Sequence, residues 1–90
     1  MFDADRIRSL IEAALPDCVA RVDDPGRDGM HFQAEVTSSA FAGRSRIEQH
    51  QLVYGALGDH MRSDIHALQL KTFLPDAWPY GRPSGSAGVR

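Results

Sequence analysis

The sequence contains little cysteine, no long apolar run and no excess of charge of either sign. Of its 90 residues one is a cysteine, Cys18, which excludes an internal disulfide framework and a four-cysteine zinc site. No stretch approaches the roughly 18 apolar residues of a membrane span. The opening Met-Phe-Asp-Ala-Asp-Arg lacks the basic flank and apolar run of a secretory signal. We therefore expect a cytoplasmic protein that does not enter a membrane.

Motifs of catalysis and of common nucleic-acid-binding domains are also missing. There is no nucleophile elbow, no Gly-rich phosphate loop and no paired-carboxylate motif, so we do not expect an enzyme. The formal net charge of −2 makes the chain as a whole a poor electrostatic trap for nucleic acid. Hydrophobic residues make up 42% and charged residues 24%, which is typical of one folded domain.

Two segments have the apolar spacing of amphipathic helices. Residues 4–15 should form the first helix, with Asp3 or Asp5 as its N-cap and its end before Pro16. Residues 45–61 should form the second, because Ser45 and Glu48 form a capping box. We expect its buried stripe to comprise Ile47, Tyr54, Leu57 and Met61, widened by Val53 and Ala56, and its polar side to comprise Arg46, Gln49 and Gln51. Gly55 and Gly58 should weaken it.

Three segments alternate in polarity as strands do: residues 18–23, 31–37 and 65–72. The Pro- and Gly-containing loop 24–30 should join the first two in a hairpin. A helical crossover favours parallel pairing of the third strand with an earlier one. The chain is therefore predicted to be a single α+β domain of order αββαβ, with a three-stranded mixed sheet and helices on one face.

The predicted core and domain limits follow from these elements. Apolar positions facing the sheet–helix interface are Ile11, Phe32, Val36, Val53, Leu57 and Leu68. We expect the domain to span residues 1–78. Residues 79–90 are rich in Pro, Gly and Ser and should form a flexible tail.

Histidine is the most promising residue type for a functional site, since imidazole is a common metal ligand. Four histidines occur: His31, His50, His60 and His66. His31 and His66 each begin a predicted strand, and parallel pairing would put them side by side at one sheet end. Two imidazoles are too few to hold a metal without further ligands, and ordinary surface histidines are the alternative.

A second candidate site is basic. Arg44 and Arg46 lie around the start of the second helix, where phosphate groups or DNA could bind. An ordinary solvated turn is the alternative, because only two arginines are involved. Asp23, Asp24 and Asp28 read as solvated loop acids, and Cys18 as a small thiol on the apolar face of a strand.

The stretch Phe41-Ala-Gly-Arg-Ser-Arg-Ile-Glu-Gln-His-Gln-Leu-Val-Tyr-Gly-Ala-Leu57 resembles the BolA family. So do Ile65-His-Ala-Leu-Gln-Leu-Lys-Thr72, the closing Pro75-Asp-Ala-Trp78 and the pair His31-Phe32. The resemblance covers residues 4–78 in order. It implies a fold similar to class II KH domains.

The resemblance also implies a partner and a cofactor. BolA proteins pair with monothiol glutaredoxins that carry a Cys-Gly-Phe-Ser site, and the heterodimer shares a [2Fe–2S] cluster. Ligands come from the glutaredoxin cysteine and a glutathione thiolate on one side and from BolA side chains on the other. The free protein should hold no cofactor. We expect it to be a monomer, with at most weak homodimer formation.

Family membership would also suggest the ligands. The histidine of the third strand's Ile-His-Ala motif is the family's usual ligand, which is His66 here. The second family ligand is a Cys or His between the first two strands, and residues 24–30 contain neither. His31 and Asp28 are the candidates for this role. The family is also described as DNA-binding through a helix-turn-helix-like segment, here residues 38–61, and this alternative places Arg44 and Arg46 on the DNA.

Overall fold

The computed structural model describes residues 3–65 and 67–81. Its elements follow the order predicted from sequence, with one extra short helix. They are α1 (Ala4–Ala14), β1 (Val19–Asp23), β2 (His31–Thr37), a 3-10 turn (Ser39–Phe41), α2 (Arg46–Leu57), α3 (His60–Ser63), β3 (Ala67–Phe73) and a second 3-10 turn (Pro75–Ala77). The α+β class is confirmed. No helix in the described ranges is long and apolar enough to cross a membrane.

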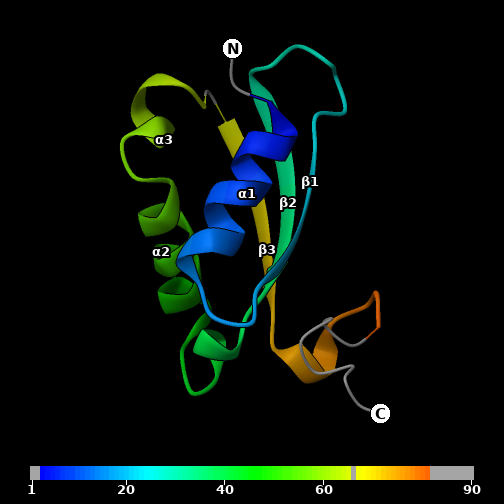
Figure 1. The fold of residues 1–90 in the computed structure, drawn as a ribbon, viewed down its shortest axis with the longest axis vertical. Coiled ribbons are helices and arrows are strands. Elements are labelled where there is room, and N and C mark those ends of the chain that lie inside the picture. Colours follow the sequence, from blue (N-terminus) through cyan, green and yellow to red (C-terminus); the bar gives the residue numbers. More distant parts are fainter. Residues whose placement is uncertain (1–2, 66, 82–90) are drawn as a thin grey trace.

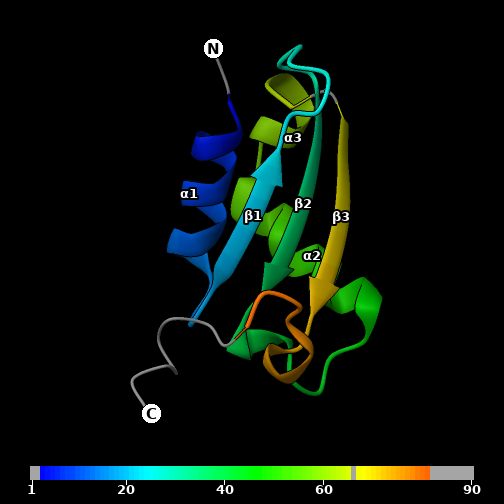
Figure 2. The same cartoon turned by 90° about the vertical axis from the view of Figure 1, so that its right-hand side faces the viewer.

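The three strands form one mixed sheet in the order β1-β2-β3. β1 pairs with β2 antiparallel, in a register that sets Ala20 opposite Val36 and Val22 opposite Ala34. β3 pairs with β2 in parallel, with Phe32 opposite Leu68. Both helices α1 and α2 cover the same face of the sheet, and the other face is open (Figures 1 and 2). This is the predicted arrangement.

Helix α1 begins and ends where its sequence requires. The Asp3 carboxylate accepts a hydrogen bond from the Arg6 N–H, so Asp3 is the N-cap. Leu15 is extended (φ −115°, ψ 144°), as expected for the residue before Pro16. Ile7 and Ile11 are fully buried against the sheet and α2.

Helix α2 is shorter than predicted. The capping box is present, since the Glu48 N–H donates to Ser45 Oγ (3.2 Å) and the Ser45 N–H donates to Glu48 Oε1 (2.8 Å). The helix ends at Leu57 instead of continuing to residue 61. Gly58 takes φ +56° and ψ −133°, a conformation open essentially to glycine alone, and the chain restarts as the four-residue α3.

The buried stripe of α2 was predicted wrongly in part. Val53 and Leu57 are buried as expected, but Ile47 is 71% exposed and Tyr54 37% exposed. Gln49, assigned to the polar side, is buried in their place. Its amide Nε2 donates to the Arg44 carbonyl (3.0 Å), and its Oε1 accepts from Thr72 Oγ1 (2.7 Å). A buried amide is tolerated because these bonds satisfy it.

Strand β3 starts later than predicted, at Ala67 rather than at residue 65. Ile65 precedes the strand and is buried in the core. Of the predicted core, Ile11, Phe32, Val36, Val53 and Leu57 are buried. Leu68 is only half-buried, because β3 is at the edge of the sheet.

The chain after β3 folds back toward the open face. Trp78 is buried, and its ring packs edge-on against the rings of Phe73 and Tyr80. The distances between ring centroids are 5.7 Å to Phe73 and 5.2 Å to Tyr80. Tyr80 in turn stacks under the Arg21 guanidinium (4.0 Å). Of the predicted tail 79–90, residues 82–90 lie outside the described residues.

Candidate functional site

One end of the sheet gathers the residues predicted to bind a metal. The 24–30 loop, the start of β2 and the start of β3 lie together at this end, beside α3 (Figure 1). The register pairs His31 with Ala67, and the Ala67 N–H donates to the Met30 carbonyl (2.9 Å). The parallel pairing therefore puts His31 next to the chain position that follows His66. His66 itself lies outside the described residues.

The 24–30 loop is organised by two aspartates read from sequence as solvated loop acids. The Asp24 carboxylate accepts hydrogen bonds from the N–H groups of Asp28 (3.3 Å) and Gly29 (2.9 Å). Asp28 Oδ1 accepts from the N–H groups of Met30 (2.9 Å) and His31 (3.1 Å). Each acid thus caps the turn that follows it, a local pattern that aspartate favours in loops.

Asp28 also holds the side chain of His31. Asp28 Oδ2 lies 3.0 Å from His31 Nδ1, so the two candidates for one ligand position are bonded to each other. The N–H groups of Met30 and His31, together with the ring of His31, hold the pKa of Asp28 well below its usual range. An ionised carboxylate can only accept a hydrogen bond, so Nδ1 carries the donated hydrogen and the lone pair of a neutral imidazole is on Nε2. This is how outer-shell carboxylates orient metal-binding histidines.

Donors for a metal are few at this end. Among residues 3–65 and 67–81, no group of three His, Cys, Asp or Glu side chains could hold a metal ion. Of the predicted ligands, the structure places His31 and Asp28 at this end, with the imidazole of His31 held by Asp28.

The two remaining histidines are elsewhere. His60 Nδ1 lies 2.6 Å from Asp64 Oδ2 on the exposed side of α3. His50 lies on α2, with its ring edge-on to Tyr54 (6.4 Å). Neither was predicted to share a metal with the other, and the structure keeps them apart on different helices.

The two arginines considered for nucleic acid lie at the start of α2. Arg44 Nε donates to the Ala40 carbonyl (2.9 Å), which ties this side chain to the preceding turn. Arg46 is exposed and lines a groove beside β3. The element before α2 is a single 3-10 turn of three residues, Ser39–Phe41. The segment is therefore a shorter helix pair than a helix-turn-helix module uses.

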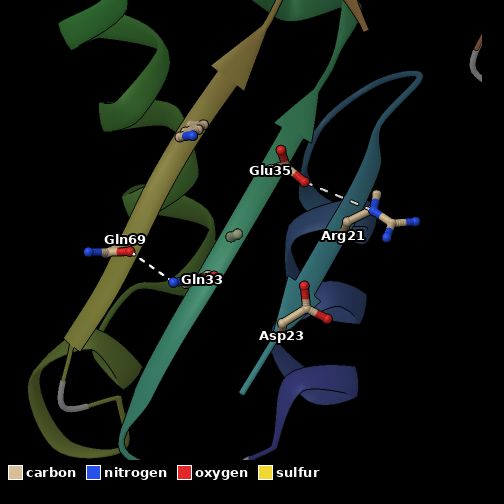
Figure 3. Close-up of a pocket in the computed structure, with 7 residues that line it drawn as sticks. Arg21, Asp23, Gln33, Glu35 and Gln69 are labelled. Carbon is tan, nitrogen blue, oxygen red and sulfur yellow. Dashed lines mark hydrogen bonds and ion pairs between the residues drawn. The ribbon is translucent and has the colours of Figure 1, made fainter. Parts of the chain in front are cut away.

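The open face of the sheet carries a polar hollow of about 190 Å³ that sequence reasoning had not singled out. Figure 3 shows its side chains standing on three adjacent strands. Gln33 Nε2 donates to Gln69 Oε1 (3.1 Å), and Arg21 Nε lies 4.0 Å from Glu35 Oε1. These two pairs link neighbouring strands, and the charged side chains of Asp23 and Lys71 also line the hollow.

Cys18 is set apart from these sites. It lies just before β1, half-buried against the core. Burial, with the nearby Glu12 carboxylate second, raises the pKa of the thiol to about 12. The thiolate is thus strongly disfavoured, which agrees with the expectation of an unreactive side chain.

The elements and their order define a small α+β domain with a three-stranded mixed sheet. The family model of BolA-like proteins matches residues 17–77. The chain therefore belongs to the BolA family. Its sequence is 44% identical over 46 residues to the UV-induced protein uvi31 of Schizosaccharomyces pombe. That match covers 51% of this chain and 45% of uvi31, so the chain spans less than half the length of that relative.

Solved structures agree with this assignment. A BolA homologue from Coxiella burnetii is 43% identical, with a TM-score of 0.74 over 84% of this chain and 95% of that one. The BolA domain of SufE1 from Arabidopsis thaliana is 32% identical, with a TM-score of 0.71 over 81% of this chain and 92% of that domain. The fold predicted from the resemblance is confirmed.

Proposed function

We propose that this protein is a non-enzymatic adaptor that binds a monothiol glutaredoxin and shares a [2Fe–2S] cluster with it. It would act in iron–sulfur cluster assembly or trafficking and in iron or redox homeostasis. The observation that carries the proposal is the pairing of His31 with Ala67, which brings His31 beside the Ile-His-Ala segment. Family membership and the similarity to the BolA domain of SufE1 support it.

The donor set fits a shared cluster better than a resident one. His66 and His31 would supply imidazole nitrogens, and the glutaredoxin cysteine and glutathione would supply thiolates. Imidazole in place of thiolate lowers the negative charge of a [2Fe–2S] cluster and raises its reduction potential. The role of Asp28 is then to hold the His31 ring through Nδ1, because both of its carboxylate oxygens are already engaged.

The test is reconstitution of the heterodimer with a monothiol glutaredoxin, glutathione, iron and sulfide. Visible absorption and circular dichroism report the cluster, and far-ultraviolet circular dichroism reports the fold. His66→Ala should abolish or strongly destabilise the cluster with the fold intact. His31→Ala should weaken it less. Wild-type spectra and lifetime from the His66→Ala protein would show that the ligand assignment is wrong.

Asp28→Asn tests the positioning role separately. Loss of an outer-shell partner typically costs about 10- to 100-fold in metal affinity, so we expect a shorter cluster lifetime by a factor in that range. Asp64→Asn is the matched control, because it removes the carboxylate from the other His–Asp pair, His60 with Asp64. Equal effects of the two variants would mean that Asp28 does not act through His31.

A further inference from the structure

The outer edge of β3 is a backbone edge that no other strand covers in the described sheet. β3 is the last strand in the order β1-β2-β3. Figure 2 shows it at the margin of the sheet, with α2 behind it. An edge strand presents unpaired backbone donors and acceptors and can pair with an added strand.

The hydrogen-bond pattern identifies the residues that face outward. The Ala67 N–H donates to Met30 on β2. In a parallel ladder, alternate residues of a strand bond to the same neighbour, so Gln69, Lys71 and Phe73 continue this pattern. The backbone groups of Leu68, Leu70 and Thr72 therefore point away from the sheet.

A groove of about 370 Å³ runs along this edge between β3 and α2. It is lined by Arg46, His50, Leu70, Lys71, Thr72 and Phe73. Two of these side chains are cationic and none is acidic. The groove also lies at the N-terminal end of α2, whose dipole favours negative charge. Its charge thus complements an acidic ligand.

His50 adds a polar group that lacks a partner. Its Nε2 is buried and makes no hydrogen bond within the described chain. Leaving a buried polar atom unsatisfied is costly, so native structures seldom keep one without a partner. Tyr54 follows one turn after His50 on the same side of α2 and is 37% exposed. The groove therefore combines the basic side chain of Arg46, the imidazole of His50 and the aromatic ring of Phe73, and Tyr54 lies beyond this lining.

We propose that this edge binds an extended acidic peptide segment of a partner protein, which adds to the sheet as a strand next to β3. The outward backbone groups of Leu70 and Thr72 would pair with the peptide main chain, and its carboxylates would meet Arg46 and Lys71. β-strand addition of this kind takes its affinity from main-chain bonds and its specificity from side-chain pockets. Two cations are few for a nucleic acid, and the alternating edge groups match a peptide. The proposal does not depend on the glutaredoxin proposal.

The test uses the full chain and a capped hexapeptide of alternating glutamate and valine, followed by amide hydrogen exchange and nitrogen–proton NMR. We expect new protection at the Leu70 and Thr72 amides. The Lys71 amide, already bonded to β2, should change little. Arg46→Glu should weaken binding about tenfold or more, since it reverses the charge that faces the peptide. Arg62→Glu on the exposed α3 is the control and should leave binding near the wild-type level.

Several outcomes would overturn the proposal. The first is that the acidic peptide does not bind at millimolar concentration, and the second is that a lysine–valine hexapeptide binds equally well. The third is that binding protects amides of the open face instead of those at the β3 edge. Displacement of the peptide by a single-stranded oligonucleotide that binds more tightly would assign the groove to nucleic acid. Protection of Leu70 and Thr72 that grows with protein concentration alone would assign it to self-association.

Discussion

At the residue scale, Asp24 and Asp28 fix the conformation of the 24–30 loop through hydrogen bonds from backbone N–H groups. Asp24 caps the turn ahead of Gly29, and Asp28 caps the start of β2 while holding the ring of His31. The spacing Asp28-x-x-His31 is a signal that could have been read from sequence, since it brings a carboxylate within reach of both the N–H and the ring three residues on. Sequence analysis treated the two residues as alternatives, whereas the structure joins them.

Cys18 gives a prediction at this scale. Burial, with the Glu12 carboxylate second, raises its pKa from 9.0 to about 12. Near pH 8 this lowers the thiolate fraction about a thousandfold relative to an ordinary thiol, and alkylation should slow accordingly. The measurement is the rate of iodoacetamide labelling, with the urea-unfolded chain as the reference. Comparable rates in the folded and unfolded protein would contradict it.

The same shift predicts how stability changes in alkali. A thiol whose pKa is raised in the folded state ionises more readily when unfolded. Folding stability should therefore fall as the pH rises above 9, the ordinary thiol value. A Cys18→Ala protein, measured by urea unfolding from pH 8 to 10.5, should lose less stability over that range than the wild type.

At the element scale, α2 shows how a helix with a mixed surface chooses its buried side. Ile47 is exposed although apolar, and Gln49 is buried although polar. Gln49 reaches both the turn before the helix, through Arg44, and β3, through Thr72. These contacts exist only when the helix lies across the sheet, so apolar spacing alone pointed to the wrong stripe.

The buried side of α2 can be tested by truncation. Leu57 is 1% exposed and should lose about 2–5 kcal/mol of unfolding free energy when replaced by Ala. Ile47→Ala is the matched control on the same helix and should change stability by less than about 0.5 kcal/mol, because Ile47 is 71% exposed. Urea unfolding measures both. A loss below about 1 kcal/mol for Leu57→Ala would mean that α2 does not pack on the sheet through this residue.

At the scale of the whole molecule, function depends on what the domain leaves exposed. One face of the sheet is covered by α1 and α2, and the other carries paired charges and amides (Figures 2 and 3). The β3 edge carries backbone groups with no neighbouring strand in the described sheet, and the histidine-bearing end carries His31, held by Asp28. The two proposals place a second molecule at these two positions.

DNA binding belongs to the scale of the whole molecule. It depends on the net charge of the protein as well as on Arg44 and Arg46. With a formal net charge of −2 and Arg44 tied to Ala40, we expect affinity no better than the ~10⁻⁴–10⁻⁶ M of non-specific binding. Fluorescence anisotropy with several duplexes at rising salt measures it. Tight, sequence-selective binding at physiological salt would make a DNA-binding regulator the better account of this protein.

The sequence by itself determined the α+β class, the N-cap at Ser45, the alternation of β2 and the family. It limited the first N-cap to Asp3 or Asp5. These depend on local geometry and on motifs, which neighbouring residues specify. Tertiary structure alone decided that Gln49 is buried, that Ile47 is exposed and that Leu68 is only half-buried. Such features arise from contacts between elements distant in the chain, whose energies a local pattern does not contain.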